Sequence, residues 1–149
     1  VRAMYGMPEG VTAYFASTRN ANSSPSRYGL QIFGSRGMIE LLEGTMPSVK
    51  FLGDGSWSPG RSGKSWQDVS TAGIGEAEPL QGKPYQARHL LAIRELISAI
   101  EENRDSIGGI ESARAGVEMI MAVFESHRQG GPVSLPLENR QHPLSMLEG

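Results

Sequence analysis

The chain has 149 residues, a formal net charge of −2, 38% hydrophobic residues and no cysteine. That length suits one domain with a sizeable core, and the lack of cysteine excludes disulfides, thiolate nucleophiles and Cys-ligated zinc. The small net charge, with no basic run, argues against a nucleic-acid surface or an anionic membrane. No apolar stretch is long enough to cross a membrane, so we expect a soluble protein, and a chain without cysteine suits the reducing cytoplasm.

The N-terminal third of the chain predicts β-structure. Residues 11–17, VTAYFAS, alternate between two faces and predict a strand, and residues 20–26, NANSSPS, predict a polar turn. Residues 28–44 contain two β-type runs around a Gly-Ser-Arg-Gly turn, which predicts a hairpin, and residues 48–53, SVKFLG, predict a further strand. The predicted core face of the hairpin consists of Tyr28, Leu30, Ile32, Ile39 and Leu41. Because the strands carry apolar residues of both parities, we expect apolar side chains on both faces of the sheet.

The segment 53–83 is rich in Gly, Ser and Pro and has little periodicity, apart from one short predicted strand at Gln67–Ser70. A loop of this length inside a compact domain is usually either functional or disordered. It is therefore the first place where we expect a functional site.

After residue 83 the apolar period changes from 2 to 3.6, which predicts two amphipathic helices. Their apolar stripes are Leu90, Ile93, Leu96, Ile97 and Ile100, and Ile110, Ala113, Val117, Ile120, Met121 and Phe124. Residues 130–132, Gly-Gly-Pro, predict the end of the second helix, and residues 133–137, VSLPL, predict a short edge strand. This order predicts an α+β fold, a mainly antiparallel open sheet with two amphipathic helices packed on one face. The other face is then wet, covered by a second subunit, or covered by a part of the protein outside this chain.

The histidines do not predict a catalytic or metal site. His89, His127 and His142 have no spacing typical of metal ligands. Ser126 and His127 are neighbours on a predicted helix, so their side chains point about 100° apart and cannot form a nucleophile–base pair. We therefore assign no catalytic residue and no metal ligand to this chain.

Three glutamates recur every seven residues on the second predicted helix, at Glu111, Glu118 and Glu125. Arg114 and Arg128 follow the first and the last of them by three residues. This spacing favours a solvated, ion-paired helix face over a catalytic pair of carboxylates.

The decapeptide WSPGRSGKSW, residues 57–66, resembles a phosphate-binding loop at first sight. Residues 63–65, Gly-Lys-Ser, match the end of the pattern G-x-x-x-x-G-K-[ST], but Ser58 stands where the first glycine belongs. Pro59 removes a backbone donor, and the residues that follow do not predict a helix whose dipole would favour phosphate. We therefore predict that the decapeptide does not bind a nucleotide phosphate.

The same decapeptide places two indoles and two cations on one glycine-rich segment. Trp57 and Trp66 can stack on a ligand, and Arg61 and Lys64 can hydrogen-bond to hydroxyl or carboxylate groups. These four residues are our candidate substrate-binding residues. The alternative is that both Trp rings fold back and seal the loop against the sheet.

Three pieces of the sequence, in their order and spacing, resemble the C-terminal domain of the Gfo/Idh/MocA family of oxidoreductases. They are the hairpin GLQIFGSRGMIEL, the helix end ESHRQGG, and the tail VSLPL followed by HPL. The resemblance implies an α+β domain with a large open sheet, joined in the full protein to an N-terminal Rossmann domain. It also implies NAD(P)-dependent oxidation or reduction of sugars, polyols or related hydroxy compounds.

The family's catalytic groups and cofactor site do not occur in this chain. The Glu-Lys-Pro motif is not found, no histidine stands in a matching motif, and there is no strand–G-x-G-x-x-G–helix unit. Because Val1 is not an initiator Met and no signal-peptide pattern follows, we expect residues 1–149 to be a single C-terminal domain cut from a longer protein. Such a chain is inactive alone and binds no NAD or NADP itself.

The resemblance also implies partners. We expect the missing Rossmann domain to cover part of the molecule, and self-association, as a dimer or a tetramer, through the open face of the sheet. The decapeptide would then lie beside a pocket for a sugar or polyol. The alternative function is a non-catalytic carbohydrate-binding or protein-interaction module that uses the loop with Trp57 and Trp66.

Overall fold

The structure, a computed structural model, describes residues 1–18, 28–44, 47–80, 82 and 84–147, and of residues 84–88 the backbone alone. The predicted turn at residues 20–26 lies outside the described residues. The chain divides into a central unit, Arg19–Ile93, and a terminal unit, which combines Val1–Thr18 with Arg94–Gly149. That residues 1–149 form a single domain stays a prediction, and so does the packing of both helices on one face of the sheet.

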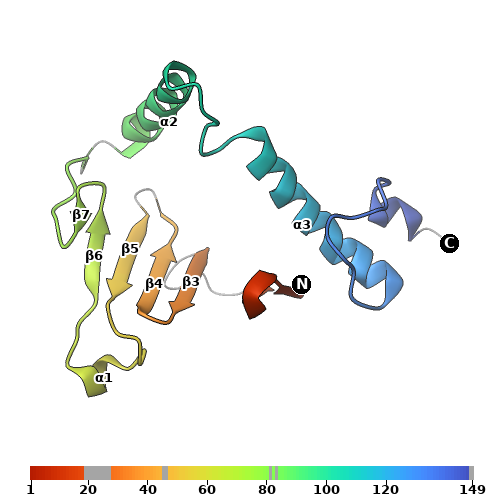
Figure 1. The fold of residues 1–149 in the computed structure, drawn as a ribbon, viewed down its shortest axis with the longest axis horizontal. Coiled ribbons are helices and arrows are strands. Elements are labelled where there is room, and N and C mark those ends of the chain that lie inside the picture. The colour runs from red at the N-terminus through yellow and green to blue at the C-terminus, as the bar shows by residue number, and fades with distance from the viewer. Residues whose placement is uncertain (19–27, 45–46, 81, 83, 148–149) are drawn as a thin grey trace. The chain divides into compact units, whose positions relative to one another are not determined.

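The central unit contains a five-stranded antiparallel sheet whose strands are neighbours in sequence order (Figure 1). Its strands are β3 (Gly29–Gly34), β4 (Gly37–Leu42), β5 (Ser48–Leu52), β6 (Gln67–Ser70) and β7 (Gly73–Ile74). The predicted hairpin, the strand after it and the short strand at Gln67–Ser70 are thus confirmed. The sequence analysis missed β7, because two residues cannot show a period. Together with the helices, this sheet makes the predicted α+β fold.

The pairing register makes one face of this sheet apolar from edge to edge. Side chains directly opposite each other share a face. The pairs on the apolar face are Leu30 with Leu41, Ile32 with Ile39, Ile39 with Phe51, Leu41 with Val49, Val49 with Val69, and Val69 with Ile74. The polar row Gln31, Glu40, Lys50 and Asp68 crosses the other face. The expectation of apolar side chains on both faces is confirmed where Phe33, Met38 and Leu52 lie opposite one another on this second face. It is wrong for the middle of that face, where Gln31 donates to Glu40 over 2.9 Å.

The turn of the β3–β4 hairpin packs tightly against the chain that leaves β5. A Cβ on Gly37, whose φ is +155°, would lie 2.1 Å from the carbonyl oxygen of the fully buried Leu52. A Cβ on Gly55 would lie 2.5 Å from the carbonyl oxygen of Ser35. No side chain fits at these two approaches, so glycine is required on both sides of the contact.

The terminal unit begins with a two-stranded antiparallel sheet, β1 (Arg2–Gly6) and β2 (Thr12–Ala16), joined through the short helix η1 (Pro8–Gly10). The predicted strand at residues 11–17 is confirmed, but it pairs with β1 and not with the five-stranded sheet. The sequence analysis missed β1, because Arg2, Ala3 and Met4 lack the β-branched or aromatic side chains that are typical of a strand. Tyr5 of β1 donates its hydroxyl to the carbonyl of Met119, over 3.1 Å.

Both predicted long helices are present. The helices are α1 (Pro59–Ser62), α2 (Pro84–Glu101), α3 (Ile110–Gln129) and η2 (Pro143–Met146). Gly130 ends α3 in the left-handed conformation, at φ +69°, and its N–H contacts the carbonyls of His127 and Ser126, which confirms the predicted stop. The packed part of α3 is its C-terminal half, where Ala122 and Glu125 are buried, whereas Ile110 of the predicted stripe is 83% exposed.

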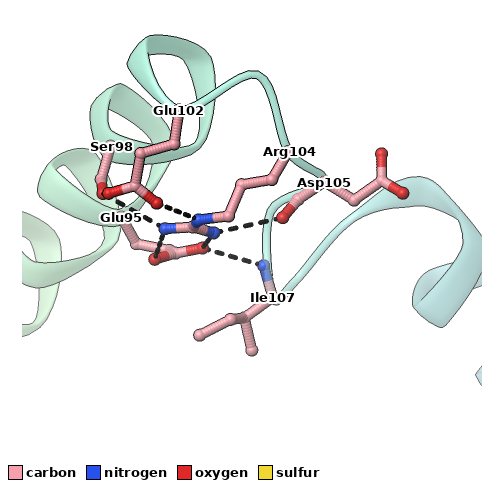
Figure 2. A network of polar contacts seen from close by, with 6 residues as sticks. All are labelled: Glu95, Ser98, Glu102, Arg104, Asp105 and Ile107. Atoms are coloured by element: carbon pink, nitrogen blue, oxygen red, sulfur yellow. Dashed lines mark hydrogen bonds and ion pairs between the residues drawn. The ribbon is translucent and has the colours of Figure 1, made fainter.

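Arg104 folds back onto the last turns of α2 (Figure 2). Its guanidinium grips both carboxylate oxygens of Glu95, at 2.8 and 3.0 Å, and its Nε donates to Glu102 over 2.6 Å. The hydrogen bond from Arg104 and that from the Ile107 N–H lower the pKa of Glu95 to about 2. This network fixes the start of the connection between α2 and α3.

The predicted edge strand at residues 133–137 is not formed. Pro132 and Pro136 have no N–H to donate to a ladder, and the N–H of Leu137 is taken by the side chain of Glu118, over 2.9 Å. The segment therefore follows α3 as irregular chain, and Leu137 is buried.

Candidate functional site

The four candidate residues lie on one structured segment, residues 53–66, which we call the Trp loop. It leaves β5, makes the single turn α1 and enters β6. Trp57 precedes α1, Arg61 lies on it, and Lys64 and Trp66 follow it. The predicted long loop is thus not structureless in this part, because a buried carboxylate organises it.

Asp54 is that carboxylate, and its residue is only 6% exposed. One oxygen accepts the backbone N–H of Ser56 at 2.9 Å and its hydroxyl at 2.7 Å. The other accepts the hydroxyl of Ser62 at 2.6 Å and the N–H of Ser58 at 3.2 Å. These bonds, that of the Ser62 hydroxyl above all and then those of Ser56, lower the pKa of Asp54 to about 2. The Trp loop is therefore folded around an ionised side chain.

Trp57, between two of the serines that bind Asp54, has an unusual backbone conformation. Its φ is +55°, in the left-handed region that bulky residues rarely adopt. Its Nε1 donates to the carbonyl of Gly34 over 2.9 Å, and its ring meets that of Phe33 edge to face, with centroids 5.3 Å apart. The residue is nevertheless 48% exposed. Its ring is thus fixed at one edge, while about half of the residue remains open to solvent.

The other three candidates surround α1 in different ways. Lys64 donates its ammonium to the carbonyl of Gly53, so its charge is partly engaged within the loop. Arg61 is exposed, and within the described residues its guanidinium has no hydrogen-bond or ion-pair partner. Trp66 is 36% exposed. No hydrogen bond or ring contact joins any two of these four described side chains. Neither indole is buried, although Trp57 folds back onto Phe33 and Gly34 of β3, so the assignment of these four residues to a substrate stays a prediction.

The backbone of the Gly-Lys-Ser sequence is arranged unlike a phosphate loop. Gly63 is the left-handed residue that ends α1, with its N–H donated to the carbonyl of Pro59. A phosphate loop needs a helix to begin after this sequence, whereas here β6 follows. The phosphate would meet no helix N-terminus, in agreement with the interpretation of the sequence.

A second polar centre lies in the terminal unit, at Glu125, which is 2% exposed. Arg128 donates two hydrogen bonds to it, at 2.6 and 2.8 Å, and Gln129 and Asn139 donate one each, at 2.7 and 3.3 Å. Arg128 is the main cause that lowers the pKa of Glu125 to about 2. The predicted pairing of Glu125 with Arg128 is confirmed, but the prediction of a solvated site is wrong at this position. Asn139 brings the C-terminal segment onto α3 here.

The other members of the glutamate row have separate partners. Glu111 pairs with Arg114 at 3.0 Å, as predicted, on the exposed helix surface. Glu118 pairs with Arg140 at 3.2 Å. Each carboxylate has its own cation, so the row does not form a shared catalytic pair.

The terminal unit also has an open groove of about 1250 Å³. It runs between β1 and the C-terminal half of α3, and its walls are mainly apolar. Ser126 and His127 both reach it, but the Ser126 hydroxyl donates to the carbonyl of Gly131 over 2.6 Å and is thereby committed to the helix end. No nucleophile–base pair forms there.

A sequence model of the oxidoreductase family C-terminal alpha/beta domain, the C-terminal domain of Gfo/Idh/MocA proteins, matches residues 10–135. The chain belongs to this family. No curated protein and no solved structure matches it. The resemblance is thus confirmed over most of the chain, including the hairpin and the helix end, whereas most of the tail lies beyond the matched residues.

In this Gfo/Idh/MocA C-terminal domain, the residues that the sequence analysis missed are those that hold the Trp loop. Asp54 could have been found, because Asp followed by serines two, four and eight residues later is typical of side-chain-stabilised turns. Phe33 and Gly34 could not, because they meet Trp57 only through the fold. Within the described ranges, no three His, Asp or Glu side chains are grouped as metal ligands. No helix in that part of the chain is long and apolar enough to cross a membrane.

Proposed function

We propose that this domain forms the substrate-pocket wall and the oligomerisation face of an NAD(P)-dependent oxidoreductase that acts on sugars, polyols or related hydroxy compounds. The membership of the oxidoreductase family supports the reaction class. The observation that supports the substrate class is the exposure of Trp57. Its indole N–H is donated to the carbonyl of Gly34, while about half of the residue remains exposed.

The chemistry of that exposed ring suits a sugar or polyol. Because the Nε1–H is already donated, the ring offers a ligand only its apolar face, which can stack on the C–H groups of a sugar. Arg61, without a partner in the described part of the chain, can donate to hydroxyl or carboxylate oxygens. A flat apolar face and a hydrogen-bond donor on the same loop are a combination that a hydroxylated ring satisfies.

The Gly-Lys-Ser sequence of the Trp loop does not fit the phosphates of the nicotinamide cofactor. Gly63 ends a helix where a dinucleotide phosphate would need one to begin, so the cofactor is held by another part of the full protein. This domain binds and orients the substrate and excludes water from one side of it. The proton and hydride transfers are carried out by residues outside this chain.

The apolar face of the five-stranded sheet supports the oligomerisation role. Within the central unit Leu30, Ile32 and Ile74 on that face are each at least half exposed, and a contiguous apolar surface of this kind normally has a cover, for which we propose a second subunit. Phe33, the partner of Trp57, has the opposite parity and lies on the other face. A subunit interface on the apolar face therefore leaves the Trp loop free for substrate.

Two measurements on the 149-residue chain test this proposal. Titration with D-glucose and with D-glucuronate, followed by ¹H–¹⁵N spectra, is expected to shift the Trp57 indole resonance, and the variant Trp57→Asn is expected to lose the binding. Asn tolerates the left-handed backbone, so this variant deletes the ring without straining the turn. Shifts that leave the Trp57 indole unaffected would overturn the proposed site, and micromolar NAD(P) binding by calorimetry would overturn the division of roles.

Sedimentation over a concentration series tests the interface. We expect association at micromolar concentrations, and a charged substitution in the middle of the apolar face, Ile39→Lys, is expected to abolish it. The matched control Lys50→Ile changes the opposite face. A monomer that persists at high micromolar concentration would remove the oligomerisation role.

A further inference from the structure

We propose that Asp54 is a positioning residue of the Trp loop, whose carboxylate holds Trp57 in the one backbone conformation that presents its ring. The relevance of this residue to ligand binding rests on the proposed function, but the positioning itself does not. Its basis is the way in which the hydrogen bonds of Asp54 surround Trp57.

The carboxylate fixes the chain on both sides of Trp57. One oxygen binds Ser56, the residue before Trp57, through both its N–H and its hydroxyl. The other binds the N–H of Ser58, the residue after it. The N–H of Trp57 itself is donated to the backbone carbonyl of Asp54, over 3.1 Å. A single residue thus determines the backbone of all three positions, and the left-handed φ of Trp57 follows from that constraint.

The same carboxylate also fixes where the end of α1 lies relative to Trp57. Its bond to the Ser62 hydroxyl, at 2.6 Å, ties the last residue of α1 to the start of the Trp loop. The hydroxyl in turn accepts the N–H of Lys64 over 3.2 Å. Arg61 lies within the segment that these bonds close, so the backbone positions of Trp57 and Arg61 are both set by one group.

The foundation of Asp54 is rigid. Gly55 approaches Ser35 so closely that a Cβ would lie 2.5 Å from its carbonyl oxygen, and Leu52 on the other side of Asp54 is fully buried. The hairpin that supplies this contact also supplies Phe33 and Gly34, the two partners of the Trp57 ring. The loop around Asp54 and the ring of Trp57 therefore both pack against the β3–β4 hairpin. We expect a change at Asp54 to move the Trp57 ring relative to Phe33 and Gly34.

A connection between two strands does not require a buried ionised carboxylate such as that of Asp54. Burial of an ionised carboxylate is unfavourable unless it is fully hydrogen-bonded. Among the described residues no cation contacts Asp54, and its four donors are neutral hydroxyl and amide groups. A left-handed Trp is a second unfavourable feature of the same loop. Both occur in the loop that leaves about half of Trp57 open to solvent.

The test uses the indole N–H of Trp57 as a reporter in the full 149-residue chain, assigned with the variant Trp66→Phe. Its exchange with water reports the bond to Gly34. In Asp54→Asn the amide group faces the N–H of Ser58, donor against donor, so we expect indole exchange to rise at least about tenfold. Asp68→Asn is the matched control, because it removes an exposed carboxylate from β6 in the same unit, and it is expected to leave the exchange within about twofold of the native rate.

The remaining outcomes each decide the proposal. Retained backbone amide signals of β3–β5 show that a faster exchange in Asp54→Asn reflects a displaced ring in an intact sheet. If that variant does not fold, Ser62→Ala decides the matter, because it removes only one of the four bonds and is expected to raise the exchange by a smaller factor. If Asp54→Asn folds, indole exchange within twofold of the native rate in that variant would overturn the proposal. If it does not fold, exchange within twofold of the native rate in Ser62→Ala would overturn it.

The two proposals fail in different ways. If the Trp57 signal of the native chain does not respond to glucose or glucuronate, while Asp54→Asn still speeds its exchange, the proposed function fails and the positioning role stands. If both sugars shift the signal equally in native chain and Asp54→Asn, with unchanged exchange, the site stands and Asp54 has no role in it.

Discussion

The two buried carboxylates of this domain, Asp54 and Glu125, each accept four hydrogen bonds and differ in what they connect. The donors to Asp54 are neutral and come from Ser56, Ser58 and Ser62, all within eight residues. The donors to Glu125 include a guanidinium, and one of them, Asn139, lies 14 residues further along the chain. The first carboxylate shapes a loop locally, and the second fastens one segment to another. Buried charge is used here for conformation in one case and for docking in the other.

The largest loss of stability is expected from Gly37→Ala, which disrupts the close packing of the β3–β4 turn against Leu52 and Asp54. A Cβ would lie 2.1 Å from a backbone oxygen of Leu52, at a φ that side chains rarely adopt, so the free energy of unfolding of the central unit should fall by about 3 kcal/mol or more. The control is Gly116→Ala on α3, where a Cβ meets nothing within 4 Å; it should stabilise the helix by about 0.5–1 kcal/mol. Urea unfolding of both variants measures the difference, and equal effects would contradict the close approach.

Glu125→Gln should release the C-terminal segment from α3. The amide keeps one acceptor but loses the charge that Arg128 pairs with, so we expect faster amide exchange at residues 137–139 and an earlier thermal transition. The control Glu111→Gln removes a carboxylate from an exposed pair three residues before its Arg, and its effect should be several-fold smaller. Similar exchange at residues 137–139 in both variants would show that Glu125 does not dock the segment.

Acid should act on the two carboxylates over different pH windows. Both pKa values are lowered in the folded protein, Asp54 from 3.8 and Glu125 from 4.5, each to about 2. A lowered pKa contributes stability that is complete above the unfolded value and is lost as the pH falls toward the folded value. The contribution of Glu125 should therefore begin to fade near pH 4.5 and that of Asp54 only near pH 3.8. Unfolding at stepped pH, with each amide variant as reference, measures this order, and the reverse order would contradict the assignment.

The elements that sequence analysis predicted are those with a regular period or a local signal. The hairpin of β3 and β4 has both, and the helices α2 and α3 have a clear stripe and, for α3, a glycine stop. The strand predicted at residues 133–137 was wrong even though the missing N–H of Pro136 had been allowed for by placing it at an edge. The side chain of Glu118 takes the Leu137 N–H from 19 residues away, and that competitor was not considered. Local pattern does not reveal such a competitor.

The sequence allowed the candidate residues to be chosen by their chemical type, but it did not predict their geometry. Trp57, Arg61, Lys64 and Trp66 could be chosen because indoles and cations on a glycine-rich segment are chemically unusual. The left-handed φ of Trp57 and its contacts with Phe33 and Gly34 depend on how β3, 23 residues earlier in the chain, meets the loop after β5. Long-range contacts of this kind have no short-range signal in the sequence. Burial of Glu125 was missed for the same reason, because Asn139 contributes to its cover.

The most direct test of the account is steady-state kinetics of the full protein that carries this domain, assayed for the proposed reaction with a sugar or polyol as the varied substrate at saturating NAD(P). Trp57→Asn should raise KM about tenfold, the effect of one stacked ring, and leave kcat within about twofold, because the proposed function assigns the reacting groups to residues outside this chain. Asp54→Asn should raise KM in the same direction, and the double variant should be little worse than Trp57→Asn alone, because both changes remove one presented ring. An unchanged KM in Trp57→Asn would contradict the claim that the Trp loop lines the substrate pocket.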